Sequence, residues 1–316
     1  MLLDATGAAI ERAATALRQG VLVAFPTETV YGLGADATNA HAVATVFAAK
    51  GRPTFNPLIV HVASLDVAGR LGLLTDSARR LAAAFWPGPL TLVLDKQPAC
   101  PVAELATAGL ATIAVRVPAH PVAQALLGAA GVPIAAPSAN RSGHVSPTTA
   151  QHVEADLGDR VAFILDGGPT PLGLESTVVD VTGGEPVVFR LGAVARDDLA
   201  VVWGRPVAVI GQETVRPASP GMLARHYAPA TPLRLEVHAV RVGEALLAFG
   251  PAVPHHGGPM INLSASGNLV EAAGNLFAAL RALDASGAAA IAVMPIPEVG
   301  LGEAINDRLR RAARAP

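Results

Sequence analysis

Residues 21–34 read VLVAFPTETVYGLG. The apolar run over residues 21–25 has the composition of a buried strand, and it stops at a proline. Two threonines, a glutamate and two glycines follow, and ligands in open α/β sheets bind beyond the ends of strands. The threonines offer hydroxyl groups and the glycines allow a close backbone approach, so the segment is predicted to contribute to a binding site. An ordinary turn has a similar sequence, so this segment alone does not decide between the two.

The sequence on both sides of this strand alternates between helical and extended patterns. Apolar residues at helical spacing indicate helices over residues 8–20, 40–50 and 76–85. Apolar runs typical of strands occupy residues 58–62, 90–94, 112–117, 134–136, 163–166, 176–180 and 187–190. Several of these runs are almost continuously apolar, which favours a sheet covered on both faces. The alternation predicts an α/β domain over residues 1–208.

A proline-rich stretch separates this domain from a second one. Its prolines exclude a helix or a central strand, so residues 209–231 are predicted to form a linker. Beyond it, strand patterns occur at residues 245–249, 260–263 and 289–294, and amphipathic helical patterns at residues 269–284 and 302–314. Residues 232–316 are therefore predicted to form a smaller α/β domain.

The composition is that of a globular protein. The chain has 316 residues, of which 51% are hydrophobic and 15% charged, which is enough to bury a substantial core and favours two domains. Its net charge of -2 excludes a strong overall basic field for nucleic acid, although local basic clusters remain. No apolar run of about 18 residues occurs, and no secretory pattern stands near Asp4 and Glu11. We therefore expect a cytoplasmic protein without membrane contact.

Lysine is rare in this chain. Of the 23 basic residues, only Lys50 and Lys96 are lysines. A lysine that is kept inside a dense motif indicates that a compact ammonium group is needed there in place of a planar guanidinium group. The alternative is that Lys50 is a chance survivor of the bias toward arginine.

The segment around Lys50 reads KGRPTFNPLIVH over residues 50–61. Lys50 and Arg52 stand at alternate positions at the end of a predicted helix, followed by a loop braced by two prolines. A lysine as a point charge and an arginine as a fork suit the recognition of phosphate, and Asn56 and His61 add neutral polar contacts. The alternative is a solvated pair of cations that completes the helix C-terminus.

A third polar cluster follows the predicted strand at residues 134–136. It reads PSANRSG over residues 137–143 and SPT over residues 146–148, before a predicted helix. Serine and asparagine side chains beside a helix N-terminus can cradle an anion. The chain contains no P-loop and no spaced set of cysteines and histidines for structural zinc.

Together, in this order and spacing, the three clusters resemble the YrdC-like family, and the tail beyond residue 210 resembles the additional domain of its long form. Further matching segments are FWPGPLT (85–91), TIAVRVP (112–118), DGG (166–168), ESTVV (175–179), SPGM (219–222) and HYAP (226–229). The resemblance covers the whole chain. It implies an open twisted mixed sheet with helices, followed by a smaller Rossmann-like α/β C-terminal domain.

The resemblance also implies an activity. Members of this kind combine L-threonine, bicarbonate and ATP into threonylcarbamoyl-adenylate and pyrophosphate, and other proteins transfer the threonylcarbamoyl group to a tRNA adenosine next to the anticodon. Magnesium is implied together with ATP. Because the three clusters contain no acidic pair, no protein ligand for a metal is assigned. A weak direct contact with tRNA stays open.

The resemblance assigns roles to individual residues. Lys50 and Arg52 would be catalytic, through electrostatic stabilisation of the phosphates. The residues implied for ATP binding are Lys50, Arg52, Asn56, Thr112, Ser138, Asn140, Ser146, Arg190 and Tyr227. Those implied for L-threonine are Thr29, His61, Arg116, Ala136 through its backbone, and Ser176. Tyr227 of the linker would close over the nucleotide, and His226 is the alternative for that role.

Two other functions compete with this one. Arg308, Arg310, Arg311 and Arg314 could form a basic patch that binds RNA, although cations at a helix C-terminus are the simpler interpretation. Carbamoyl transfer from carbamoyl phosphate is the enzymatic alternative. It resembles longer multidomain proteins with zinc-type cysteine pairs, and this chain has a single cysteine, Cys100.

Overall fold

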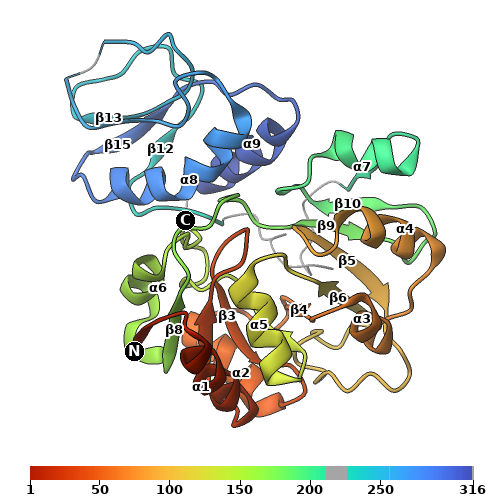
Figure 1. Ribbon diagram of the computed structural model, residues 1–316. Coiled ribbons are helices and arrows are strands. Elements are labelled where there is room, and N and C mark those ends of the chain that lie inside the picture. The colour runs from red at the N-terminus through yellow and green to blue at the C-terminus, as the bar shows by residue number, and fades with distance from the viewer. Residues whose placement is uncertain (211–225, 256, 315–316) are drawn as a thin grey trace.

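The computed structural model describes residues 1–210, 226–255 and 257–314, which form two α/β domains (Figure 1). We call residues 1–210 the N-terminal domain and residues 233–314 the C-terminal domain. The SPGM motif at residues 219–222 and most of the predicted linker lie outside the described residues. The predicted domain boundaries therefore stay predictions.

The N-terminal domain is built on one mixed sheet, with strand order β1-β8-β2-β3-β7-β4-β6-β5-β9-β10-β11. The strands are β1 (Leu2–Asp4), β2 (Val23–Phe25), β3 (Gly32–Asp36), β4 (Ile59–His61), β5 (Leu90–Asp95), β6 (Thr112–Arg116), β7 (Ile134–Ala135), β8 (Phe163–Asp166), β9 (Thr177–Asp180), β10 (Val187–Arg190) and β11 (Ala208–Val209). Parallel neighbours such as β4 and β6 occur beside antiparallel ones such as β5 and β6. The predicted mixed α/β sheet is confirmed.

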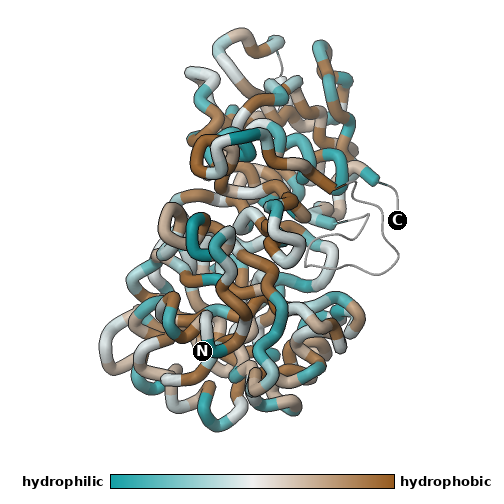
Figure 2. The backbone as a smooth tube through the Cα atoms, turned by 90° about the vertical axis from the view of Figure 1, so that its right-hand side faces the viewer, coloured by the Kyte–Doolittle hydropathy of each residue, from teal (hydrophilic) through white to brown (hydrophobic). Residues whose placement is uncertain are grey.

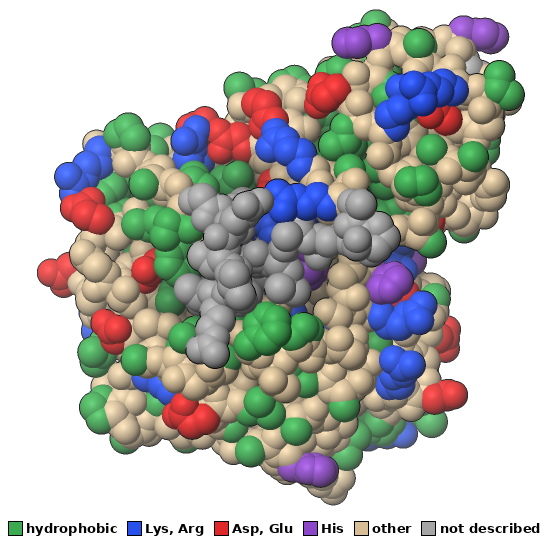
Figure 3. Space-filling model, turned by 180° about the vertical axis from the view of Figure 1, so that it is seen from behind, with side chains coloured by type: hydrophobic (Ala, Val, Ile, Leu, Met, Phe, Trp, Pro, Cys, Tyr) green, Lys and Arg blue, Asp and Glu red, His purple; other side chains and the backbone are tan. Residues whose placement is uncertain are grey.

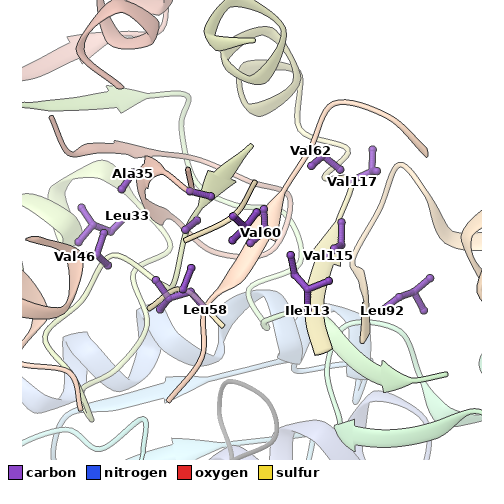
Figure 4. Packing of buried hydrophobic residues seen from close by; sticks show 14 of the residues in the cluster. Leu33, Ala35, Val46, Leu58, Val60, Val62, Leu92, Ile113, Val115 and Val117 are labelled. Carbon is purple, nitrogen blue, oxygen red and sulfur yellow. The ribbon is translucent and has the colours of Figure 1, made fainter. Parts of the chain in front are cut away.

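Helices cover this sheet on both faces. They are α1 (Gly7–Arg18), α2 (Ala40–Lys50), α3 (Leu65–Leu71), α4 (Asp76–Phe85), α5 (Pro121–Ala130), α6 (Ala150–Leu157) and α7 (Arg196–Trp203), with a 3-10 turn η1 at Gly158–Arg160. In β2, Val23 and Phe25 pack against α1 and α5, whereas Ala24 belongs to the cluster that contains α2 and α4. Successive residues of a strand point to opposite faces, so one short strand supports both layers. Figure 4 shows part of the second cluster, with Leu33 and Val60 among its members.

The two glycines of the opening motif do not form the predicted turn. Gly32 and Gly34 lie in β3, which pairs with β2 in antiparallel fashion, although Gly32 does line the cavity described below. A Cβ atom at Gly34 would lie 2.9 Å from both Ile134 and the Phe25 ring. The glycine therefore makes room for side chains of the neighbouring strands, which is a packing role.

The C-terminal domain has a four-stranded parallel sheet, in the order β12-β15-β13-β14. Its elements are β12 (Leu233–Arg234), β13 (Glu244–Ala248), β14 (Met260–Asn262), α8 (Leu269–Asp284), β15 (Ala290–Val293) and α9 (Leu301–Ala312). Helices α8 and α9 lie between this sheet and the N-terminal domain (Figure 1). The smaller α/β unit predicted for the tail is thus present.

The two domains share a hydrophobic cluster. Val30, Val145 and Leu174 of the N-terminal domain belong to the same cluster as the apolar faces of α8 and α9. Apolar segments run through the interior of both domains (Figure 2). Within the described parts of the chain, three ion pairs also join them: Arg281 with Asp156, Arg308 with Glu175, and Arg196 with Glu303. Among the described residues, no helix has the length and apolar character needed to cross a membrane.

Candidate active site

A cavity lies where the polar segments of the N-terminal domain meet residues 226 and 227. Nine of the fourteen predicted site residues line it: Thr29, Arg52, His61, Arg116, Ala136, Ser138, Ser176, Arg190 and Tyr227. Three of these side chains are arginines, and they are all buried. The cavity therefore suits a ligand with several negative charges.

Arg52 reaches this cavity because helix α2 ends two residues before it, at Lys50. Gly51 takes the left-handed conformation with a φ of 60° and caps the helix. The Arg52 side chain then donates from Nε to the Asn56 carbonyl at 3.2 Å and from Nη2 to the Pro57 carbonyl at 2.9 Å. Burial and the charge of Arg190 lower the pKa of Arg52 to about 9, so the group is a cation at neutral pH.

Lys50 does not line the cavity, whereas the sequence predicted that Lys50 and Arg52 would both recognise phosphate. Its ammonium group is buried and donates to the carbonyls of Ser138 and Asn140, both at 2.5 Å, and more weakly to Asn140 Oδ1 at 3.4 Å. Burial, followed by the charge of Arg52, lowers the pKa of Lys50 well below 10.5. The contacts give Lys50 a positioning role for the Ser138–Asn140 loop, and its catalytic role stays a prediction.

The Ser138–Asn140 loop is held against the opening motif as well as by Lys50. Leu33 donates its backbone N–H to the Pro137 carbonyl at 2.8 Å, and Ala139 donates to the Tyr31 carbonyl at 2.8 Å. Within the loop, the Ser138 hydroxyl donates to Asn140 Oδ1 at 2.6 Å. The structure therefore joins the first and third sequence clusters into one wall, in which Ser138 faces the cavity.

Arg116 ends strand β6 beside the opening motif. Its guanidinium group donates to Glu28 at 2.6 Å, to the Thr29 hydroxyl at 2.9 Å and to the Gly88 carbonyl at 3.2 Å. Burial raises the pKa of Glu28, but the Arg116 charge and hydrogen bonds outweigh it and hold the pKa below 4.5. Arg116 and Thr29 are thus fixed next to each other on the cavity wall.

Ser176 and Arg190 form a further part of the cavity wall. Arg190 donates from Nη2 to the Ser176 carbonyl at 2.8 Å and to its hydroxyl at 3.0 Å, and the same hydroxyl lies 2.8 Å from Thr91 Oγ1. Ser176 precedes β9 and Arg190 ends β10, and these strands are antiparallel neighbours. Sheet pairing therefore brings two residues 14 positions apart into contact.

Three side chains on the wall carry a buried polar atom without a hydrogen-bond partner among the described residues. These atoms are His61 Nδ1, His226 Nδ1 and the Tyr227 hydroxyl. Buried polar atoms are normally paired, so these are candidate contacts for a ligand. Burial and the nearby Arg116 lower the pKa of His61 to about 3, and the ring is therefore neutral at physiological pH. His226, the alternative to Tyr227, also lines the cavity.

Five predicted site residues lie outside the cavity wall: Lys50, Asn56, Thr112, Asn140 and Ser146. Ser146 is one contact away, because its hydroxyl donates to the cavity residue Glu175 at 2.5 Å. Asn56 is fully buried behind Arg52, and its side-chain atoms have no partner among the described residues. Thr112 begins β6, about 13 Å along the strand from Arg116. Their ATP contacts stay predictions.

Sequence reasoning missed the part played by two carboxylates and one arginine. Glu28 stands within the opening motif and Glu175 within the ESTVV segment, so a carboxylate that closely follows or directly precedes an apolar strand pattern, inside a motif assigned to the site, was the available signal. Arg308 gave no signal, because its partner Glu175 lies 133 residues away in the chain. Arg308 and Arg311 are buried, so the proposed RNA-binding patch at the C-terminus is wrong for these two residues.

Two family models match most of the chain. A model of the Sua5, YciO and YrdC proteins, described as telomere recombination, matches residues 15–192. A model described as threonylcarbamoyl-AMP synthase, C-terminal domain, matches residues 194–314. The second model starts before α7 and β11, so it also covers the last helix and strand of the N-terminal domain.

Relatives of nearly the same length point the same way. The chain is 41% identical to the threonylcarbamoyl-AMP synthase of Bacillus subtilis, over 96% of this chain and 92% of the relative. It is 42% identical to that of Pyrococcus abyssi, over 96% and 94%. The crystal structure of P. abyssi Sua5 complexed with L-threonine superimposes with a TM-score of 0.92 at 38% identity, covering 99% of this chain and 97% of that one. The chain therefore belongs to the threonylcarbamoyl-AMP synthase family, in its two-domain form.

Proposed function

We propose that this chain is a nucleotidyltransferase that forms threonylcarbamoyl-AMP and pyrophosphate from L-threonine, bicarbonate and ATP. The observation that carries the proposal is one buried cavity lined by Arg52, Arg116 and Arg190, together with the neutral donors and acceptors of Ser138 and Ser176. A substrate that brings both a triphosphate and an amino-acid carboxylate requires this density of cations.

L-threonine is assigned to the Arg116 side of the cavity. Arg116 binds the carboxylate, and the adjacent Thr29 and His61 contact the polar groups of the amino acid. His61 is neutral, so it adds a hydrogen bond without adding charge beside Arg116. Ser176 and the backbone of Ala136 complete this subsite. The support is their common position on the cavity wall.

ATP is assigned to the side formed by Arg52, Ser138 and Arg190. Arg52 and Arg190 bind phosphate oxygens, and the Ser138 loop packs along the nucleotide with Lys50 beneath it. Asn56, Thr112, Asn140 and Ser146 are the further residues of this subsite, and Tyr227 covers the nucleotide. Burial, followed by the charge of Arg190, lowers the pKa of Arg52, so added phosphate charge would be favourable at this position.

The chemistry requires no protein nucleophile. The threonine amine attacks bicarbonate to form a carbamate with loss of water. A carbamate oxygen then attacks the α-phosphorus of ATP, and the bond to the β-phosphate oxygen breaks, so pyrophosphate leaves with the electron pair. Negative charge rises on the α-phosphoryl oxygens and the departing pyrophosphate, and the arginines stabilise it.

Exclusion of water is the other task of the cavity. A carbamate is labile, so it must stay dry and close to the α-phosphate until it reacts. His226 and Tyr227 are both buried and cover one side of the cavity where the two domains meet. This arrangement supports a closed reaction chamber.

Magnesium is proposed to enter with ATP rather than as a resident metal. Among the described residues, no group of three or more histidine, cysteine or acidic side chains is arranged to hold a metal ion. The acidic side chain on the cavity wall, Glu175, already accepts from Ser146 and Arg308. Bound to the phosphates, the ion would neutralise their charge and be coordinated mostly by phosphate oxygens and water.

The product fixes the place of this reaction in a sequence. An activated threonylcarbamoyl group must be consumed by an acyl transfer, and we assign that step to separate tRNA-modifying proteins in the cytoplasm. A weak contact of this chain with tRNA remains part of the proposal. On the face shown in Figure 3, basic and acidic side chains are interspersed. This mixture of charges favours a weak contact with the tRNA backbone over a strong one.

Pyrophosphate release from ATP tests the function. The purified chain is expected to release pyrophosphate only when L-threonine and bicarbonate are both present, and less with L-serine or L-alanine. No release with threonine would overturn the activity, and equal release with the other amino acids would overturn the substrate. Tight, salt-sensitive tRNA binding without turnover would favour an RNA-binding module instead.

A further inference from the structure

Tyr227 contributes its hydroxyl to the cavity but has its ring fixed by the C-terminal domain. The ring stacks on Phe277 of α8, with centroids 5.8 Å apart and an interplanar angle of 21°. The guanidinium carbon of Arg308, in α9, lies over the same ring at 4.7 Å from its centroid. The residue adopts a φ of 65°, a conformation that a non-glycine residue keeps only when its surroundings enforce it.

Arg308 also holds a second residue of the cavity wall. Its Nε donates to Glu175 at 2.9 Å, while the other Glu175 oxygen accepts from the Ser146 hydroxyl at 2.5 Å. The remaining arms of Arg308 donate to Asp307 at 2.6 Å and to the Leu191 carbonyl at 2.7 Å. Glu175 directly precedes Ser176, which is bonded to Arg190. One buried guanidinium group therefore reaches two separate parts of the wall.

We propose that Arg308 is a positioning residue of the active site, and that the C-terminal domain serves the reaction by holding Tyr227 and Glu175 in place through it. The inference rests on the proposed function for its kinetic consequences. Arg308 itself does not line the cavity. It acts through the two residues that do.

The chemistry of arginine explains the choice of residue. A planar guanidinium can lie on an aromatic ring and at the same time direct its N–H groups at oxygens in its own plane. A lysine ammonium cannot satisfy both contacts, and an apolar side chain would leave the Glu175 carboxylate buried with one partner fewer. Arg308 is fully buried, and its carboxylate partners Glu175 and Asp307 compensate the cost of burying its charge.

In the competing interpretation, Arg308 only holds the two domains together. The structure offers a control residue that tests this interpretation. Arg281 of α8 pairs with Asp156 of α6 at 2.6 Å and thereby joins the same two domains. Its other hydrogen bond within the described residues goes to the Val145 carbonyl at 2.5 Å, and no hydrogen bond or ion pair described for it reaches Tyr227 or Glu175. Arg281→Met therefore removes an interdomain ion pair without releasing those two residues.

The test uses the full-length chain labelled with 13C-tyrosine. The protein has two tyrosines, Tyr31 and Tyr227, and Tyr227→Phe assigns their NMR signals. In Arg308→Met we expect the Tyr227 ring signal to shift or broaden while the Tyr31 signal stays in place. We also expect kcat/KM for pyrophosphate release to fall about 100-fold. In enzymes generally, a misplacement of about 1 Å in the reacting geometry costs a factor of this size. Arg308→Lys should change the Tyr227 signal and kcat/KM in the same direction but less. Arg281→Met should lower the unfolding temperature and leave the Tyr227 signal and kcat/KM unchanged.

Three results would overturn the proposal. These are an unchanged Tyr227 signal with wild-type kcat/KM in Arg308→Met, an equal loss of activity in Arg281→Met, and a loss of activity without a change at Tyr227. If Arg308→Met unfolds, both tyrosine signals collapse together, and Arg308→Lys decides by the same criteria. If the wild-type chain releases no pyrophosphate, the proposed function fails, while the Tyr227 signal and the Kd for ATP still report on Arg308.

Discussion

The carboxylate of Glu28 accepts a hydrogen bond from Arg116 Nη2 at 2.6 Å, and its other oxygen accepts from the backbone N–H of Ala119 at 3.0 Å. Both side chains are buried, so the pair is shielded from solvent. This contact orients the arginine that we assign to the substrate carboxylate. It also explains why a glutamate stands among the threonines of the opening motif.

Glu28→Gln is expected to destabilise the fold by about 3 kcal/mol at neutral pH, because it leaves a buried arginine without its counter-charge. Burial raises the pKa of Glu28, yet Arg116 holds it below 4.5. A lowered pKa in the folded state adds stability above the pKa of the unfolded chain, and this stability is lost as the pH falls through the folded pKa. The wild type should therefore lose more stability below pH 4.5 than the variant does.

Urea unfolding at several pH values measures this difference. Glu185→Gln is the control, since Glu185 pairs with Arg205 on the surface and both side chains are exposed. Its effect is expected to stay below about 1 kcal/mol at neutral pH. Equal destabilisation by the two substitutions would contradict the account of the buried pair.

Lys50→Arg is expected to lower the rate of pyrophosphate release about 100-fold although it keeps the charge. The Lys50 ammonium fits between the carbonyls of Ser138 and Asn140, and a guanidinium group is too large and planar for that position. Lys96→Arg is the control, because Lys96 pairs with the exposed Glu104. Steady-state kinetics with threonine and ATP would compare the two, and similar activities would refute a special need for lysine at position 50.

His61 is expected to stay neutral throughout the physiological range. Burial and Arg116 lower its pKa to about 3, so it should not titrate between about pH 5 and 8, where an ordinary histidine does. Nitrogen-detected NMR of 15N-histidine protein over this range, with His61→Gln to assign the signal, measures it directly. A His61 midpoint between pH 6 and 7 would contradict the buried, cation-flanked environment.

Gly173→Ala is expected to destabilise the protein by about 3 kcal/mol, through overpacking and backbone strain together. An added Cβ would lie 2.5 Å from the carbonyl oxygens of both Ala273 and Gly274 in α8, and the φ of Gly173 is 65°. Gly131 has the same φ, and a Cβ there meets nothing within 4 Å. Gly131→Ala should therefore cost only the strain, about 1 kcal/mol. Equal unfolding free energies for the two variants would show that the domains do not pack tightly at Gly173.

Much of the fold was predictable because periodicity is a local signal. The buried runs at residues 90–94 and 187–190 match β5 and β10 closely, and the helix predicted at residues 76–85 is α4. Short or atypical elements were not predictable. Strand β3 begins at Gly32 and contains two glycines, which are weak strand formers, and it forms because β2 and β7 pair with it on either side.

The candidate site divides in the same way. Arg52 and Ser138 stand in dense polar motifs, whereas Arg116 and Ser176 were assigned through the family resemblance, and all four line the cavity. The direction of a side chain could not be predicted in this way. Lys50 and Arg52 are two positions apart, yet the end of α2 turns Lys50 toward the Ser138 loop and Arg52 toward the cavity.

The sequence by itself determined the class of sheet, the polar clusters at strand ends and the membership of the family, because each depends on residues that are close together in the chain. Only the tertiary structure decided that Glu28 orients Arg116, that Lys50 supports a loop, and that Arg308 reaches Tyr227 and Glu175. These are contacts between residues 81 to 133 positions apart. Their geometry follows from how the sheets and helices pack, and no local pattern encodes it.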